Sequence, residues 1–253
     1  MTTEPLIILM YHHIARPPSS VRIRGMYTTP RQFEQHLAWL IRRGFFFTTF
    51  SALSCPGKSK PPIRSRRTVI LTFDDGHRDN FTHAFPILNK FGVPAVIFPV
   101  IGDIGKTGVV WPESSEKTPT DLLTSAQIRQ MADAGIEFGS HLMRHVRLAK
   151  LPLSEQRAEL SESKARLEEI VQRPVESVAY PYGSFNRHVV DLAREAGYRY
   201  GVSIQEGLND ARENPLTLNR YTAKGNKLYH PLKFRRMIRK GLARFERGER
   251  REA

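Results

Sequence analysis

The feature that most constrains the fold is an alternation of short apolar runs with amphipathic helical patterns. Seven runs are predicted to be strands, at residues 6–11, 68–73, 94–100, 136–140, 177–182, 198–204 and 215–221. Helical patterns lie between them at residues 29–44, 80–91, 124–134, 154–171 (with Ser154 as N-cap) and 186–196. Continuous apolar strands separated by helices are typical of a parallel sheet buried on both faces. The order favours a (β/α) barrel or an open doubly wound sheet.

The length of 253 residues suits one barrel domain, so we expect a single domain over residues 1–253. Residues 51–67 and 102–121 are expected to be loops, because they are rich in Pro, Gly, Ser and charged residues. Part of the formal charge of +14 lies at residues 224–253, as a basic amphipathic helix over 233–246 and a tail. We expect this helix to cover the barrel. Peripheral contact with an anionic membrane is the alternative.

Cysteine content and apolar runs indicate the compartment and the kind of metal site. The single cysteine, Cys55, excludes an intramolecular disulfide and a thiolate cluster, so any metal would be held by His, Asp or Glu. The run at 6–11 lacks the features of a signal peptide. Unless a leader has been removed, we expect a cytoplasmic protein, with the inner membrane face as a peripheral position. No nucleic-acid partner is expected, because only the charge would support one.

Two acidic residues end the clearest predicted strand. Asp74 and Asp75 follow the run at 68–73, and Gly76 allows the backbone to turn sharply after them. Adjacent carboxylates raise one another's pKa unless a cation neutralises them. The carboxyl ends of parallel strands form the functional face of such folds. The pair indicates either a cation site or a helix cap with a turn aspartate.

Two histidines follow another predicted strand at the same edge of the fold. His141 and His145 are four residues apart, a spacing that lets both meet one metal ion, although nine histidines make a chance pair common. Together with one carboxylate they would form a ligand set that leaves coordination positions open for water and substrate. The second carboxylate would then be free to act as a base.

These motifs resemble those of a known enzyme family. Thr-Phe-Asp-Asp-Gly at 72–76, Ser-His-x-x-x-His at 140–145 and Tyr-Pro-Tyr-Gly at 180–183 resemble the polysaccharide deacetylases, the NodB-homology domain of carbohydrate esterase family four. Tyr-His-His-Ile at 11–14, the helix at 33–44 and residues 207–209 with 215–220 are similar to the subgroup acting on poly-N-acetylglucosamine-like exopolysaccharides. The resemblance runs along most of the chain. It implies a distorted (β/α)7 barrel and hydrolysis of the N-acetyl amide of amino sugars.

The resemblance also implies roles for individual residues. Asp74 would be the general base, and Asp75, His141 and His145 would bind one divalent metal, commonly zinc, with nickel, cobalt or manganese as alternatives. The backbone N–H of Tyr182 would stabilise the oxyanion. Contacts to the substrate are expected from Tyr182, Pro181, His13 and Trp111, whose indole could stack on a sugar ring.

Three departures from the family pattern affect these roles. Leu142 stands where the family usually has a hydroxyl residue, and Ala179 where it usually has the arginine that pairs with the base. We expect Arg220 to take over that pairing. The general acid is often a histidine near the end of the domain, but His230 lies in a polar stretch. In the exopolysaccharide subgroup a histidine after the first strand is similar to a replacement, so the resemblance implies this role for His12, with His13 as second choice.

Other functions remain open. A deformylase, or another amide hydrolase that does not act on peptides, could use the same scaffold, since the motifs fix the metal and bond type better than the substrate. A catalytically silent carbohydrate-binding relative is a further alternative. It would be expected to lose an aspartate or histidine that this chain retains.

Overall fold

The strands form a parallel sheet that curves around a buried interior. The computed structural model describes residues 5–19, 21, 24–54, 67–113, 118–210, 212–223 and 231–249. The main sheet has the order β5-β4-β3-β1-β8, and β2 pairs with β3. Its strands are β1 (Leu6–Tyr11), β2 (Phe46–Phe47), β3 (Thr68–Asp75), β4 (Val96–Pro99), β5 (Glu137–Phe138) and β8 (Tyr221–Thr222).

Two single bridges close this sheet into a ring. Strands β6 (Ser177–Ala179) and β7 (Tyr200–Val202) form a separate parallel pair. Ser140, just after β5, bridges to Val178 of β6, and Val202 of β7 bridges to Leu218, just before β8. Because β8 pairs with β1, the circuit is complete. The described residues therefore form an irregular barrel, and the predicted distorted (β/α)7 fold is confirmed.

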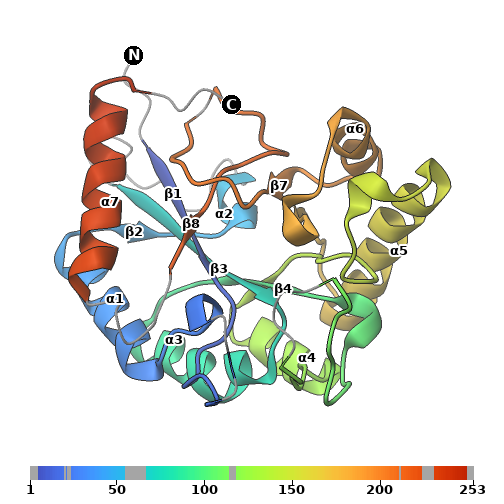
Figure 1. The fold of residues 1–253 in the computed structure, drawn as a ribbon, viewed down its shortest axis with the longest axis horizontal. Coiled ribbons are helices and arrows are strands. Elements are labelled where there is room, and N and C mark those ends of the chain that lie inside the picture. Colours follow the sequence, from blue (N-terminus) through green and yellow to red (C-terminus); the bar gives the residue numbers. More distant parts are fainter. Residues whose placement is uncertain are drawn as a thin grey trace.

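Helices surround the ring (Figure 1). They are α1 (Pro30–Arg42), α2 (Phe50–Ser54), α3 (Phe85–Phe91), α4 (Ser125–Asp133), α5 (Leu153–Val171), α6 (Arg187–Glu195) and α7 (Pro231–Glu246). Short turns η1 (Arg24–Met26), η2 (Asn80–Ala84), η3 (Ile101–Asp103), η4 (Leu148–Lys150) and η5 (Pro181–Gly183) link them to the strands. Capping boxes begin α1 and α4, with Thr29 and Thr124 as the N-caps.

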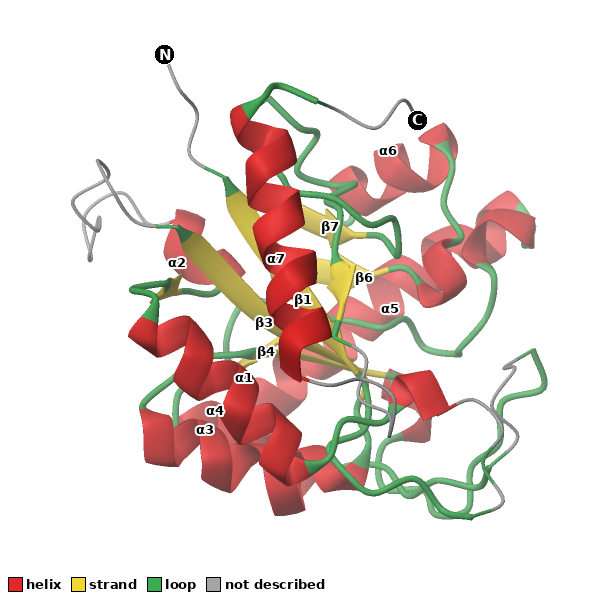
Figure 2. Cartoon of the chain, turned by 60° about the vertical axis from the view of Figure 1, so that its left-hand side comes forward, coloured by secondary structure: helices red, strands yellow, loops and turns green. Residues whose placement is uncertain are grey.

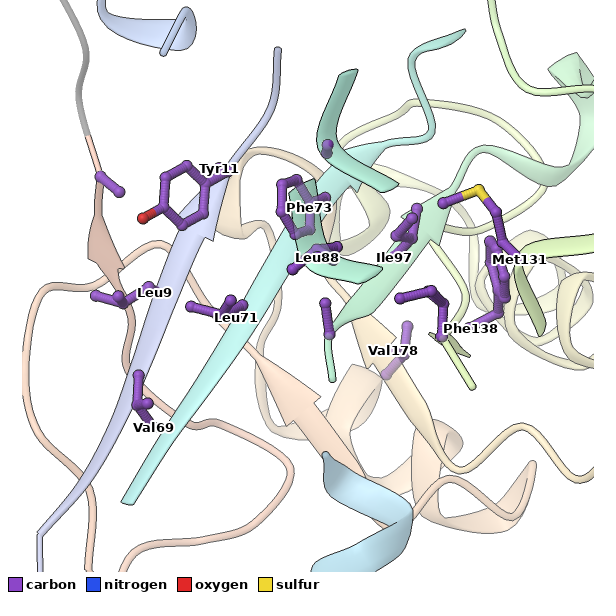
Figure 3. Close-up of a cluster of buried hydrophobic side chains, with 14 of the residues drawn as sticks. Leu9, Tyr11, Val69, Leu71, Phe73, Leu88, Ile97, Met131, Phe138 and Val178 are labelled. Carbon is purple, nitrogen blue, oxygen red and sulfur yellow. The ribbon is translucent and has the colours of Figure 1, made fainter. Parts of the chain in front are cut away.

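Alternate residues of each strand face opposite sides of the ring. Figure 3 shows Leu9 and Tyr11 of β1 beside Leu71 and Phe73 of β3, in the layer between strands and helices. A smaller buried cluster fills the interior of the ring, from Ile8, Phe50, Ile70, Val96, Phe98, Ala179, Val202 and Leu218. Continuing this alternation from Ile8 and Ile70 assigns His12 and Asp74 to the interior side.

Several sequence predictions need correction. The last strand covers only Tyr221–Thr222 rather than 215–221, because Asn214 forms a turn by accepting from the Leu216 and Thr217 N–H groups. Ser154 is not an N-cap: α5 begins at Leu153 with Pro152 in the cap position and no side-chain cap.

The predicted loop at 51–67 contains the end of α2, and its residues 55–66 lie outside the described residues. The predicted loop at 102–121 is confirmed at most of its described residues, although it opens within η3, and its residues 114–117 lie outside the described residues.

The C-terminal helix packs on the barrel as expected, but begins at Pro231 rather than residue 233. Figure 2 shows it lying across α1 and β1. Phe234, Ile238 and Leu242 are buried, and the Phe234 ring stacks on His36 of α1 with 3.9 Å between centroids. No helix of the described residues is long and apolar enough to cross a bilayer.

Candidate active site

The two aspartates lie where β3 ends beside β4. Asp74 pairs with Phe98 and Asp75 with Pro99. The backbone then enters the left-handed region at two successive residues, with φ of 73° at Asp75 and 72° at Gly76. A Cβ at Gly76 would lie 2.7 Å from that of Pro99, so only glycine fits without displacement. This turn ends the regular alternation of β3 and separates the two carboxylates.

Asp75 faces the two predicted histidine ligands. Its Oδ1 lies 3.3 Å from Nε2 of both His141 and His145. The Nδ1–H of His141 donates to the Ala179 carbonyl at 2.8 Å, which leaves the Nε2 lone pair facing the carboxylate. In His145, Nδ1 is 2.9 Å from the Tyr182 hydroxyl.

These three side chains are arranged to hold a metal ion. Their ligand atoms lie within 4.8 Å of one another. Asp75 Oδ1 is buried and accepts no hydrogen bond from the described residues, an arrangement that a cation would explain. One carboxylate and two imidazoles form a donor set that suits divalent transition metals. The predicted grouping of Asp75, His141 and His145 is confirmed as geometry.

Arg220 pairs with Asp74, as predicted from the missing arginine of the third motif. Its Nη1 and Nη2 donate to the two carboxylate oxygens at 2.6 and 2.7 Å. Nη1 also donates to Thr72, and Nε to the Ser203 carbonyl, and Arg220 is fully buried. Burial alone would raise the pKa of Asp74, but the charge and hydrogen bonds of Arg220 outweigh it and lower the pKa below its ordinary value.

The two histidines after β1 occupy different environments. Burial lowers the pKa of His12 to about 4, although the charges of Asp75 and Asp74 nearby oppose the shift. His13 is held by Asp79, with 2.6 Å between its Nδ1 and the carboxylate. Its ring stacks between Tyr27 and His77, at centroid distances of 4.2 and 3.5 Å. His12 is therefore the histidine of this pair near both aspartates, whereas His13 supports the wall of the site.

Trp111 and Tyr182 flank His145. The Trp111 ring lies 4.6 Å from the His145 ring, and its Nε1–H donates to Asp103. Pro181 is buried at the start of η5, and Tyr182 follows with a left-handed φ of 58°. Burial raises the pKa of the Tyr182 hydroxyl to about 12. The structure thus brings the predicted site residues to one end of the barrel.

Sequence reasoning missed two residues. His77 Nε2 lies 3.2 Å from Asp75 Oδ2, the oxygen turned away from His141 and His145, and its Nδ1 contacts Thr120 at 2.9 Å. Its position directly after Asp-Asp-Gly was an available signal. The second residue is Glu159 of α5, which contacts the segment between the two ligand histidines. Nothing in the charged pattern of α5 distinguishes this glutamate from its neighbours.

A parallel-strand barrel with an Asp-His-His site and a buried aspartate beside it defines a metal-dependent hydrolase. The model of the polysaccharide deacetylase family matches residues 62–201. The Bacillus subtilis (strain 168) protein YxkH, whose name assigns it to the polysaccharide deacetylases, is 30% identical over 217 residues, which are 85% of this chain and 70% of that protein. The chain therefore belongs to the polysaccharide deacetylase family.

Further relatives agree. A poly-beta-1,6-N-acetyl-D-glucosamine N-deacetylase of Staphylococcus aureus (strain MSSA476) is 25% identical over 225 residues, 85% of this chain and 74% of that protein. The structure of the Streptococcus pyogenes deacetylase PplD in complex with acetate superposes with a TM-score of 0.78 at 25% identity, over 94% of this chain and 99% of that one. The structure of IcaB from Ammonifex degensii, at 23% identity, shares the fold with a TM-score of 0.71, over 87% and 92%.

Proposed function

We propose that this chain removes the N-acetyl groups of a poly-N-acetylglucosamine-like saccharide by metal-assisted hydrolysis. The observation that carries the proposal is the placement of the Asp75, His141 and His145 ligand set beside an ionised Asp74. The Staphylococcus aureus relative, named for its action on poly-beta-1,6-N-acetyl-D-glucosamine, supports the substrate class. A silent binding protein is disfavoured, because the ligands and the base are all present.

Asp75, His141 and His145 would hold one divalent ion, with zinc the first choice and nickel, cobalt or manganese as alternatives. When bound, the ion supplies Lewis-acid chemistry at the acyl oxygen and acidifies water. Asp74 accepts the proton of the attacking water, a role for which Arg220 keeps it ionised. The Tyr182 N–H lies in the first turn of η5, where no intrahelical acceptor exists, and donates to the oxyanion.

We propose His12 as the group that protonates the departing sugar amine. It lies on the interior side near Asp74, whose charge acts on it. With a pKa of about 4 its imidazole is neutral at neutral pH in the free protein, so it must gain a second proton during the reaction before it can act as an acid. Transfer of the proton that Asp74 takes from water would satisfy this requirement. His13 is a weaker candidate, because its Nδ1 and both ring faces are already in contact with protein groups.

An acyl-release screen tests the substrate class. Purified protein supplied with zinc or cobalt is incubated with β-1,6-linked N-acetylglucosamine oligomers and, separately, with N-formylated amino sugars. Release of acetate supports the proposal. Formate release without acetate would move the assignment to a deformylase. Binding of oligomers without release of either acid, in protein that contains metal, would favour a silent relative.

We further propose that the exposed basic side chains of α7 contact an anionic membrane, which would place the protein at the inner membrane face. These side chains are Lys233, Arg236, Arg239, Lys240 and Arg244, and Leu232 is 59% exposed at the same helix. Basic residues near an anionic surface favour adsorption.

Cosedimentation tests this with phosphatidylglycerol and phosphatidylcholine vesicles. The double variant Arg236→Glu with Arg239→Glu should lose binding to the anionic vesicles. The matched pair Arg157→Glu with Arg166→Glu on α5 should retain it. Equal binding to both vesicle types, or retention by the α7 variant, would overturn the proposal.

A further inference from the structure

We propose that Glu159 is the positioning residue that holds the segment between the two ligand histidines. This inference rests on the proposed metal site. Glu159 lies in the middle of α5, and its side chain is only 4% exposed. Its Oε2 accepts from the backbone N–H groups of Met143 and Arg144, both at 2.9 Å, and its Oε1 accepts from Arg144 Nε. One buried carboxylate thus binds the backbone immediately before His145.

The segment needs this support because it is not part of a helix or strand. Leu142 adopts a left-handed φ of 66°, which is costly for a residue with a side chain, and its N–H donates to Ser140 Oγ. The Leu142 and Met143 carbonyls accept from Ile101 and Gly102. On the other side, the Met143 and Arg144 N–H groups have Glu159 as their acceptor.

Glu159 also accounts for the departure at Leu142. A hydroxyl there could organise the segment locally, but Leu142 is fully buried among apolar neighbours instead. A carboxylate from α5 provides the alternative, and charge-assisted bonds to backbone N–H groups are stronger than neutral ones. Arg144 in turn also donates to Glu155, so two acidic residues of α5 fix its side chain.

Glu159 therefore acts through backbone geometry rather than by contact with the metal ligands. Its contacts fix the chain one residue before His145, whose Nε2 must stay within 3.3 Å of Asp75 Oδ1. Loss of partners that orient metal ligands typically costs about 10–100-fold in metal affinity. We expect a loss in this range when the carboxylate is removed.

The test compares Glu159→Ala, Glu159→Gln and Gln156→Ala. Zinc and cobalt affinities are measured by competition with a chelator, and the visible spectrum of bound cobalt reports the coordination geometry. Glu159→Ala should weaken affinity 10–100-fold and alter the cobalt spectrum. Glu159→Gln keeps an acceptor oxygen for both N–H groups and should recover most of the affinity. Gln156 is buried three residues earlier on α5 but donates to Leu151, so Gln156→Ala should match the wild type.

Different results would refute the metal site and the positioning role of Glu159. Wild-type protein that binds neither ion would refute the metal site itself. Wild-type affinity in folded Glu159→Ala protein, with an unchanged cobalt spectrum, would overturn the positioning role alone. If that variant does not fold, Glu159→Asp keeps the charge but withdraws the carboxylate by one methylene. It should lose affinity, and unchanged affinity there would equally overturn the role.

Discussion

The guanidinium of Arg220 binds both carboxylate oxygens of Asp74 inside the barrel, although the two residues are 146 positions apart. This bidentate pair links the segment just before β8 to the end of β3. Neither group is solvated, so the Asp74 carboxylate depends on the guanidinium to remain charged. Closure of the barrel brings Arg220 to Asp74, and the proposed base therefore stays ionised only in the closed barrel.

Replacing Arg220 should change the pH dependence of catalysis. In Arg220→Met, burial would act on Asp74 without its main opposition, so the pKa of Asp74 would rise and the acidic limb of kcat/KM would move to higher pH. Breaking a buried pair should also cost about 3–5 kcal/mol of stability. Arg220→Lys keeps the positive charge but loses the two parallel hydrogen bonds of the guanidinium, so it should shift the acidic limb of kcat/KM less. An acidic limb that stays in place in a folded Arg220→Met variant would refute the role assigned to this pair.

Two glycines with positive φ should respond differently to alanine. At Gly92, after α3, an added Cβ meets nothing within 4 Å, so Gly92→Ala should cost only the left-handed backbone penalty of about 1–2 kcal/mol. At Gly76 the Cβ would meet Pro99, so Gly76→Ala should cost more and weaken metal binding by moving Asp75. Thermal unfolding and metal titration of both variants check this. Equal losses of stability in the two variants, with metal affinity intact in both, would show that Pro99 does not require glycine at position 76.

His36 should make the fold sensitive to acid. Burial lowers its pKa to about 3, so protonation favours the unfolded chain. The stabilisation is fully present above the ordinary pKa of 6.5 and is lost as the pH falls from there towards 3. In this window the contribution of His36 to the free energy of unfolding should fall by about 1.4 kcal/mol for each unit by which the pH is lowered. Denaturant unfolding of His36→Gln should show a shallower acid dependence than wild type. His188→Gln, exposed on α6, should not, and a wild-type slope in His36→Gln would reject the assignment.

Replacing His12 should separate proton transfer from metal binding. His12→Gln is expected to lower kcat about 100-fold, as loss of a general acid does, while metal content stays unchanged. His13→Gln should have a smaller effect. His230→Gln is the third variant, because His230 is the histidine near the end of the domain, and it lies outside the described residues. A large loss in His230→Gln with none in His12→Gln would transfer the role to His230.

Strands and site motifs were predictable because both carry strong local signals. The apolar runs predicted β1 with its observed bounds and most of β3. Because the carboxyl ends of parallel strands meet at one edge, Asp75 and His141 were expected to lie close together, and they do. The pairing of Arg220 with Asp74 was predicted only through the arginine missing from the third motif.

What escaped prediction depends on tertiary contacts. The short β8 and the turn at Asn214 are set by barrel closure and side-chain capping, which weak periodicity does not reveal. The role of Glu159 follows from how α5 packs beside the ligand segment, and its sequence context resembles a solvated helix face.

The most direct test of the central claim is a metal titration that follows acetate release. Protein stripped with a chelator is titrated with zinc or cobalt while acetate is measured from N-acetylglucosamine oligomers, with Asp75→Asn as the control. Activity should be absent at first, rise to a plateau at about one ion per chain, and remain absent in the control. Full acetate release by metal-free protein, or equal activation of Asp75→Asn, would contradict the account.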